Sequence, residues 1–350
     1  MPLTPRVAAG LVWLTACGVT LAQAPQPTAQ APASGQVAPP AGQRGGRGGR
    51  GGAPNEGRGQ GGPALTIERD LEYSRAGGVS LTLDLYYIDP IGLDLGGTQY
   101  RLYPTPSRGA DTLASYRVYF PPDYQASTTR RYPVIYFLHG RSVDSKRPIT
   151  SGYVTRADAA IRSGVMPPAI VVLAQGLTTG WYVDAQDGQH PMESVIVKDL
   201  VAHVDATYRT MATREARAIE GHSMGGFGAL HIGFKYPDLF AAVTGNSPAL
   251  VENVTDGVGD QAFWDAQAPA TLAKANIDKV RKQAIRIIVG DQDGLFPVGK
   301  KLDDALTELE IAHEFLPVVG SPHNHDQLLQ YETFDTMAFY GKVFGKTTGK

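Results

Sequence analysis

The stretch "RAIEGHSMGGFGALHIGF", residues 217–234, changes character at one serine, Ser223. The residues before it form a short run typical of a buried strand, and the apolar side chains after it recur at the spacing of a helix. Glycine weakens a helix by roughly 1 kcal/mol relative to alanine. The glycines crowded around Ser223 therefore serve something other than local stability.

The serine lies in the pattern G-x-S-x-G, formed by Gly221-His222-Ser223-Met224-Gly225. Where a strand turns tightly into a helix, this pattern holds the serine at strained backbone angles and raises its hydroxyl above the sheet. The flanking glycines remove clashes, and the first amides of the helix point at developing negative charge. A tight turn with an incidental serine would share the pentapeptide, but the strand before it and the helix after it favour a nucleophile.

Strand-like and helical patterns alternate along most of the chain. Strands are expected at residues 114–120, 132–140, 168–176, 216–223, 239–248, 284–293 and 313–320, and helices at 194–209, 225–237, 297–310 and 326–345. This alternation predicts an α/β fold, with a mostly parallel central sheet covered by helices on both faces. In such sheets, functional sites lie beyond the carboxyl ends of the strands.

A serine hydroxyl is a weak nucleophile until a positioned base accepts its proton. In α/β-hydrolases the order along the chain is serine, acid, histidine. Asp293 follows a predicted strand in "VGDQDGLF", with Asp291 as its rival, and we favour Asp293. The loop "VVGSPHNHDQLL" offers both His323 and His325 as the base, and no third ligand nearby supports a zinc site.

An oxyanion hole needs two backbone amides aimed at the tetrahedral intermediate. Met224, directly after the serine, is expected to supply one of them. The second is expected from Arg141, in the loop that follows "YFLHG", where Gly140 allows close approach. A plain strand end with a turn glycine is the alternative explanation of His139-Gly140.

Several stretches together resemble the esterase D (feruloyl esterase-like) family of α/β-hydrolases: "RYPVIYFLHG", "PAIVVLAQG", "VIVKDLVAHVDATYRT", "RAIEGHSMGGFGALHIGFKYPDLFAAVTGNSPAL" and "GSPHNHDQLL". The resemblance covers residues 112–345 and implies an α/β-hydrolase fold with a triad of serine, aspartate or glutamate, and histidine. Its nucleophile falls on Ser223, its acid in G-x-x-D on Asp293, and its base in G-x-x-H on His323 rather than His325. It implies no metal and no organic cofactor.

The N-terminal residues predict export. Residues 1–24 carry Arg6, then an apolar run and small residues, in the order of a signal peptide. Ala22-Gln23-Ala24 would be a cleavage site, whereas Leu14-Thr15-Ala16-Cys17 would instead make a lipoprotein that contacts a membrane through Cys17. Residues 25–63 predict a disordered Pro/Gly/Arg-rich linker, which leaves residues 64–350 as the esterase domain.

Charge and cysteine content narrow the function classes. The formal net charge is −2, and residues 1–63 hold five arginines and one glutamate, which leaves −6 for the remainder. An acidic body argues against a nucleic-acid partner. Cys17 is the single cysteine, so the domain has no disulfide and no cysteine nucleophile. Nothing in the sequence indicates the oligomeric state.

Two aromatic segments are candidates for substrate binding. Trp181 and Tyr182 lie in the loop 176–194, and Trp264 lies in "DQAFWDAQAP", although ordinary packing would explain all three.

Predicted export argues against a cytoplasmic S-formylglutathione hydrolase and favours acyl groups, feruloyl or acetyl, on carbohydrates. An acyltransferase to a sugar alcohol is the alternative, and a non-catalytic carbohydrate-binding protein would lack a triad member. Residues 67–90 predict an opening β-hairpin, and residues 91–111 have no template.

Overall fold

The structure, a computed structural model, describes the backbone of residues 72–76 and 79–82 and then residues 94–150, 152–250, 256–331 and 335–348. The contacts divide the chain into two units, Met1–Thr66 and Ile67–Lys350, and all described residues lie in the second. The predicted signal peptide, Cys17 and the predicted linker lie outside the described residues. Export, lipidation and the domain boundaries stay predictions.

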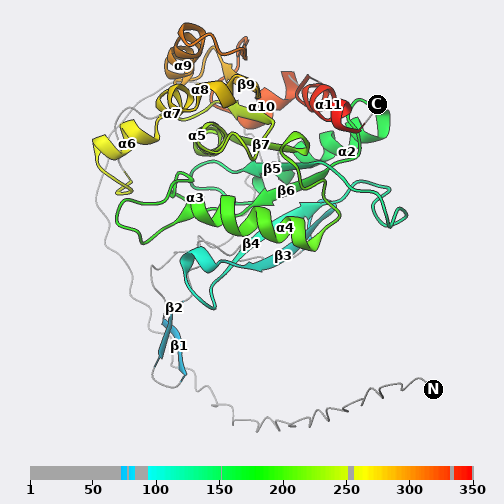
Figure 1. Ribbon diagram of the computed structural model, residues 1–350, viewed down its shortest axis with the longest axis vertical. Helices are drawn as coiled ribbons and strands as arrows, with labels where there is room; N and C mark the ends of the chain where they lie inside the picture. The colour runs from blue at the N-terminus through cyan, green and yellow to red at the C-terminus, as the bar shows by residue number, and fades with distance from the viewer. Residues whose placement is uncertain are drawn as a thin grey trace, which may run out of the picture. The chain divides into compact units, whose positions relative to one another are not determined.

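Among the described residues, eight strands form one sheet in the order β10-β9-β8-β7-β5-β6-β4-β3 (Figure 1). They are β3 (Thr98–Pro104), β4 (Leu113–Tyr119), β5 (Val134–Leu138), β6 (Ile170–Ala174), β7 (Arg217–His222), β8 (Ala242–Asn246), β9 (Ala284–Gly290) and β10 (Glu314–Val318). Strands β5 to β10 pair in parallel, whereas β4 pairs antiparallel with both β6 and β3. The predicted α/β fold with a mostly parallel sheet is confirmed.

The helices connect these strands. They are α1 (Arg147–Thr150), α2 (Tyr153–Ser163), α3 (Met192–Ser194), α4 (Val201–Thr207), α5 (Met224–Lys235), α6 (Gln261–Gln267), α7 (Pro269–Ala275), α8 (Ile277–Val280), α9 (Phe296–Glu308), α10 (His325–Tyr331) and α11 (Asp335–Thr348). A π-helical segment, η2 (Val195–Leu200), joins α3 to α4, and short 3₁₀ turns occupy η1 (Pro106–Arg108) and η3 (Arg214–Ala216).

Strand β5 shows why the sheet is covered on both faces. All five of its residues are buried, and successive side chains point to opposite faces. Val134, Tyr136 and Leu138 pack in the core with α3, α4, α5 and α9, whereas Ile135 and Phe137 pack in a second core with α2 and α11. A strand buried on both sides needs a continuous apolar run, which is the pattern seen in the sequence.

Strand β10 is less buried than β5, because it lies at one edge of the sheet. Its first three residues are half-buried, and Pro317 sits within it. Proline lacks an amide hydrogen and is therefore confined to edge strands and bulges. The loop that follows β10 carries His323, and because β7 to β10 run parallel, that histidine lies at the same end of the sheet as Ser223.

The structure refines the expected elements at both ends of the domain. The expected hairpin within residues 67–90 is seen as β1 (Glu72–Ala76) paired antiparallel with β2 (Val79–Thr82). Strand β3 falls within residues 91–111, where the sequence had no template. The single helix expected at 326–345 is instead two helices, α10 and α11. The helices α1, α2, α6, α7 and α8 were not predicted.

Candidate active site

Ser223 stands at the turn between β7 and α5. Its backbone angles are φ 58° and ψ −117°, in the region that non-glycine residues avoid at a cost of about 1–3 kcal/mol. A Cβ on Gly225 would come within 2.0 Å of the Leu138 carbonyl oxygen, and one on Gly221 within 2.2 Å of the Gly225 carbonyl oxygen. Both glycines are therefore required by space, as the G-x-S-x-G pattern predicts.

The imidazole of His323 lies between the serine and an acid. Its Nε2 is 3.0 Å from Ser223 Oγ, and its Nδ1 is 2.8 Å from Asp293 Oδ2. A carboxylate only accepts, so Nδ1 carries the proton and donates to Asp293. Nε2 is then left to accept the hydroxyl proton of Ser223. The structure thus brings together the three residues predicted for the triad.

Asp293 is held in place and kept ionised. Its side chain is 1% exposed, and its Oδ1 accepts a hydrogen bond from the Leu295 amide at 2.8 Å. Burial by itself would raise the pKa of this carboxyl, but the hydrogen bonds from His323 and Leu295 lower it below its ordinary value. The rival, Asp291, is exposed and instead accepts a hydrogen bond from the Gly320 amide at 2.8 Å.

The second histidine of the loop, His325, points into the core. It is 1% exposed, and its ring lies 4.7 Å from the ring of His222 and 5.5 Å from that of Phe137. Burial, with the nearby Arg147 and Arg156, lowers its pKa to about 3. His323, in contrast, has a side chain that is 39% exposed. Of the two, only His323 reaches the serine.

His222 was missed as part of this site. Its ring stacks on that of His323 at 5.0 Å and 28°, so it contacts one face of the imidazole. Burial, followed by the charges of His325 and His323, holds its pKa well below the ordinary value. Its position as the x before the serine was visible in the sequence, but nothing there indicated a partner.

The loop after β5 approaches the serine closely. A Cβ built on Gly140 would lie 3.4 Å from the Cβ of Ser223, and Arg141 follows at once. Met224 opens α5 and is fully buried. Met224 and the residue directly before Arg141 therefore adjoin Ser223. The guanidinium of Arg141 turns away to pair with Asp256, at 2.6 Å between Nη2 and Oδ1.

The aromatic residues predicted to bind substrate are largely buried. Trp181 is 6% exposed, Trp264 is 3% exposed, and their rings meet edge to face at 5.7 Å. Tyr182 is 1% exposed and donates a hydrogen bond to the His139 carbonyl at 3.0 Å. Tyr182 therefore holds the backbone at the end of β5 through His139, whereas Trp264 lines a cavity described below.

The sequence pattern of the family described as "Putative esterase" matches residues 110–316, which is more than half of the chain. The chain belongs to this esterase family.

Two relatives each resemble more than half of this esterase-family chain. Esterase Rv1288 of Mycobacterium tuberculosis is 28% identical over 249 residues, which are 60% of this chain and 50% of that protein. S-formylglutathione hydrolase of Arabidopsis thaliana is 27% identical over 208 residues, 52% of this chain and 71% of the relative. The chain therefore spans about half the length of the mycobacterial relative.

A solved ferulic acid esterase superposes with a TM-score of 0.62 at 20% identity, over 71% of this chain and 99% of that one. A likeness at this level of identity shows the fold, which is that of the α/β-hydrolase esterases.

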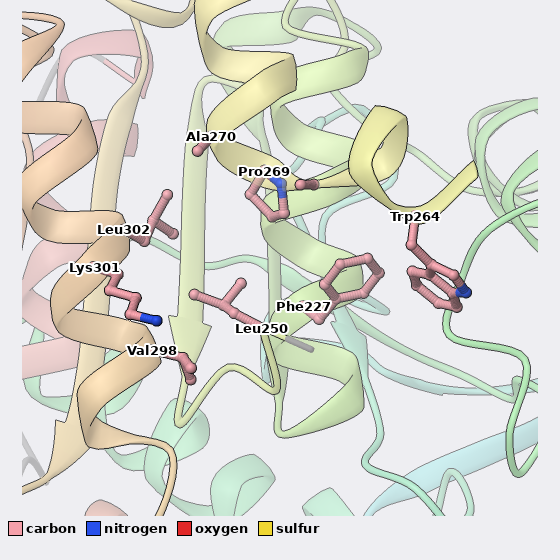
Figure 2. A pocket seen from close by; sticks show the side chains of 9 residues that line it. Phe227, Leu250, Trp264, Pro269, Ala270, Val298, Lys301 and Leu302 are labelled. Atoms are coloured by element: carbon pink, nitrogen blue, oxygen red, sulfur yellow. The ribbon is translucent and has the colours of Figure 1, made fainter. Parts of the chain in front are cut away.

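A cavity of about 160 Å³ opens next to α5, the helix that follows Ser223 (Figure 2). It lies between α5, the segment of α6 and α7, and α9, and it is lined by Phe227, Leu250, Trp264, Ala268, Pro269, Ala270, Val298, Lys301 and Leu302. The amides of Phe227 and Ala249 both donate to the Ser223 carbonyl, at 3.0 and 2.9 Å. The lining residues Phe227 and Leu250 therefore lie at or next to residues bonded to the Ser223 backbone, and apart from Lys301 the lining side chains are apolar or aromatic.

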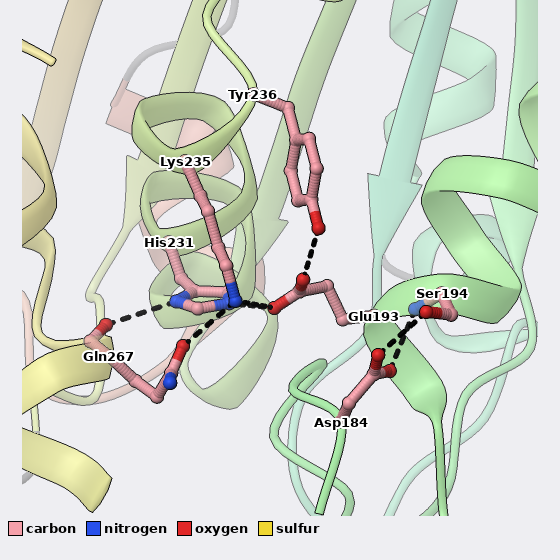
Figure 3. A network of polar contacts seen from close by, with 7 residues as sticks. All are labelled: Asp184, Glu193, Ser194, His231, Lys235, Tyr236 and Gln267. Atoms are coloured by element: carbon pink, nitrogen blue, oxygen red, sulfur yellow. Dashed lines mark hydrogen bonds and ion pairs between the residues drawn. The ribbon is translucent and has the colours of Figure 1, made fainter.

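A buried polar network fixes the helix that carries the serine (Figure 3). Glu193 of α3 accepts hydrogen bonds from His231 at 2.6 Å and Lys235 at 2.8 Å, both on α5, and from the Tyr236 hydroxyl. Burial alone would raise the pKa of Glu193, but these donors lower it to about 2. None of these bonds involves Ser223, Asp293 or His323, and the network joins α3 to α5.

Within the described part of the chain, no group of three or more His, Cys, Asp or Glu side chains is arranged to hold a metal ion. Over the same residues, no helix has the length and apolar character needed to cross a bilayer.

Proposed function

We propose that this chain is an exported serine esterase that hydrolyses carboxylic esters through an acyl-enzyme. The observation that carries the proposal is the unbroken line of hydrogen bonds from Asp293 through His323 to Ser223, with distances of 2.8 and 3.0 Å. The strained backbone of the serine and the membership in an esterase family support the same conclusion.

In the first half of the reaction, Ser223 Oγ attacks the carbonyl carbon of the ester while its proton passes to Nε2 of His323. The carbonyl electron pair moves to its oxygen, and the amides of Met224 and Arg141 donate to that oxyanion. Asp293 stabilises the imidazolium that forms. The tetrahedral intermediate then expels the alcohol, which takes the proton from Nε2, and the acyl group remains on Ser223.

In the second half, water takes the place of the alcohol. His323 Nε2 accepts a proton from the water as its oxygen attacks the acyl carbonyl, and a second oxyanion forms in the same amide pair. Collapse of this intermediate breaks the bond to Ser223 Oγ, which regains its proton from Nε2. The carboxylic acid leaves and the free enzyme is restored, so the cycle needs no metal or organic cofactor.

The substrate class proposed is acyl groups, feruloyl or acetyl, on carbohydrates. The mostly apolar cavity next to α5 supports an acyl group with a ring or alkyl part, because Phe227, Leu250 and Trp264 offer it apolar surface. A ferulic acid esterase is among the structures that share this fold. The export signal predicted from residues 1–24 supports a substrate outside the cytoplasm.

The mechanism is tested with p-nitrophenyl acetate and a fluorophosphonate probe on wild type and Ser223→Ala. We expect hydrolysis to fall by about 10⁴-fold or more and labelling to disappear in the variant, with its thermal unfolding midpoint retained. The control is Ser163→Ala, a serine on α2 whose hydroxyl donates to the Ala160 carbonyl, and it should match wild type. Equal rates in Ser223→Ala and wild type, or a folded wild type that does not label, would contradict the proposal.

The substrate class is tested with a panel of acetyl, feruloyl and longer acyl esters in the presence of sugar acceptors, with S-formylglutathione as a thioester. Preference for carbohydrate acetyl or feruloyl esters with free acid as the product is the expected result. Acylated sugar acceptor as the main product would point to an acyltransferase, and preference for the glutathione thioester would overturn the carbohydrate class.

A further inference from the structure

One carboxylate, Asp256, gathers donors from two loops that flank the nucleophile. The guanidinium of Arg141 donates to it twice, from Nε at 3.0 Å and from Nη2 at 2.6 Å. The indole Nε1 of Trp181 donates to it at 2.7 Å. Arg141 lies in the loop after β5 and Trp181 in the loop after β6, so Asp256 joins two segments that have no sequence proximity to it.

The burial and charge of Asp256 suit a fixed anchor. Its side chain is 9% exposed, against 50% for Arg141. Burial by itself would raise its pKa, but the hydrogen bonds from Arg141 and Trp181 keep the pKa below its ordinary value, so the group stays ionised. A bidentate pair of arginine and carboxylate constrains direction as well as distance.

The loop that carries Trp181 needs such an anchor. Trp181 and Tyr182 have φ values of 54° and 58°, two consecutive non-glycine residues in the left-handed region. Such a conformation persists only where surrounding contacts hold it. One contact is the Tyr182 hydroxyl on the His139 carbonyl, and the other is the Trp181 indole on Asp256.

The loop that carries Arg141 reaches the serine itself. Gly140, directly before it, approaches Ser223 so closely that a Cβ there would lie 3.4 Å from the serine Cβ. Ser142, directly after it, has φ 59° and donates its amide to the Thr178 carbonyl at 3.0 Å. The backbone of Arg141 is thus held on both sides, and its side chain is held by Asp256.

We propose that Asp256 is a positioning residue for the oxyanion hole: by holding the Arg141 guanidinium and the Trp181 indole together, it orients the Arg141 amide toward the substrate oxyanion. Asp256 does not touch the reacting atoms in this role. The inference rests on the proposed function, because it assigns a task within the same hydrolysis.

The test is Asp256→Asn, which places an amide nitrogen against N–H donors and removes the charge. We expect kcat for p-nitrophenyl acetate to fall 10- to 100-fold while KM changes less than about threefold, since a misplaced oxyanion donor weakens the transition state and spares the bound ester. Inhibition by trifluoroacetophenone, whose serine adduct carries an oxyanion, should weaken by a similar factor. If Asp256 had only a structural role, the substitution would lower the amount of folded protein, and the folded molecules would keep wild-type kcat, KM and inhibition.

Companion variants keep the test sharp if Asp256→Asn folds poorly. Arg141→Ala keeps the backbone amide and removes the guanidinium, and Trp181→Phe removes the indole donor together with part of the ring. Arg141→Ala should reproduce the loss of kcat, Trp181→Phe should show a smaller loss, and Asp256→Asn with Arg141→Ala should lose no more than the larger single effect. Additive losses in the double variant would overturn the positioning role.

Asp158 offers a matched control. It accepts hydrogen bonds from an arginine and an aromatic residue, as Asp256 does: from Arg162 Nε at 2.7 Å and from the Tyr119 hydroxyl at 2.7 Å. Tyr119, however, pairs with Val171 near the amino end of β6. Asp158→Asn should leave kcat and inhibition unchanged. Wild-type kcat in Asp256→Asn, with wild-type protein active, would overturn the inference alone. A folded wild type that neither hydrolyses esters nor labels would overturn the proposed function and this inference together.

Discussion

His323 Nε2 lies 3.0 Å from Ser223 Oγ, although 100 positions separate the two residues. Their strands are not neighbours either, since β8 and β9 lie between β7 and β10 in the sheet. The contact exists because parallel strands end at one edge, where the loop after β10 turns back over the loop after β7. The relationship predicts which substitutions remove activity and which only weaken the fold.

The two histidines of one loop should separate activity from stability. His323→Ala removes the group bonded to Ser223, so kcat should fall by about 10³-fold or more with little change in the unfolding midpoint. His325→Ala empties a buried site next to Phe137 and His222, so it should lower the free energy of unfolding by about 2 kcal/mol or more and leave kcat of the folded protein within a few-fold. Ester hydrolysis and denaturant unfolding of both variants check this, and a larger loss of kcat in His325→Ala would reverse the assignment.

The two aspartates after β9 should differ in the same way. Asp293→Asn places a possible donor against His323 Nδ1 and no longer favours the tautomer with Nδ1 protonated, so kcat should fall by about 10³–10⁴-fold. Asp291→Asn keeps an oxygen that accepts from the Gly320 amide and should retain wild-type kcat. Steady-state hydrolysis by both variants is the measurement. Comparable losses would mean that Asp291 also serves His323.

Two glycine substitutions test the space around the nucleophile. Gly225→Ala forces a Cβ to within 2.0 Å of the Leu138 carbonyl, which is backbone and cannot swing aside, so the cost should exceed about 3 kcal/mol. Gly299→Ala on α9 brings its Cβ to an ordinary 3.5 Å from Val289, and alanine favours a helix by about 1 kcal/mol over glycine. Denaturant unfolding should show opposite signs, and a stable Gly225→Ala protein would contradict the crowding at the turn.

Stability should depend on pH through His325. Its pKa in the folded protein is about 3, against an ordinary value of 6.5, because burial and then the charges of Arg147 and Arg156 disfavour the imidazolium. The unfolded chain therefore binds the extra proton between these values. The stability tied to neutral His325 is complete above pH 6.5 and is lost as pH falls toward 3, with a slope of up to about 1.4 kcal/mol per pH unit.

Unfolding free energies between pH 7 and 4 check this pH dependence. His325→Phe keeps a ring in the site and should show a shallower slope than wild type. The slope should not vanish, because burial also holds the pKa of His222 low. The control His190→Gln changes an exposed histidine and should leave the slope unaltered. Identical slopes in His325→Phe and wild type would contradict a buried neutral His325.

Much of the fold was predictable because its signals are local. A strand buried on both faces must be a continuous apolar run, so β5 and β6 could be predicted from their amino-acid sequences. The helices α6, α7 and α8 were missed because each is short, and their apolar residues do not repeat over enough turns to form a stripe. The break between α10 and α11 was missed because the pattern of 326–345 continues through it.

In the candidate site too, local features could be predicted from the sequence and contacts between distant segments could not. The sequence placed Trp181, Tyr182 and Trp264 near the substrate, but it had no means to tell an open aromatic face from a buried one. Their exposure depends on the segments that cover them, including α6 and the ring of Phe227. Asp256 was missed altogether, since a single aspartate in an irregular loop carries no local signal of its partners.

The sequence by itself determined the strand, the strained turn and the helix at Ser223, because neighbouring residues encode that geometry and glycine is required where backbone meets backbone. It also limited the acid and the base to two adjacent candidates each. Only the tertiary structure decided that Asp293 and His323 reach the serine while Asp291 and His325 do not, and that Asp256 binds both flanking loops. Those outcomes depend on distances between segments far apart in the chain, which packing of the whole sheet sets and no local pattern encodes.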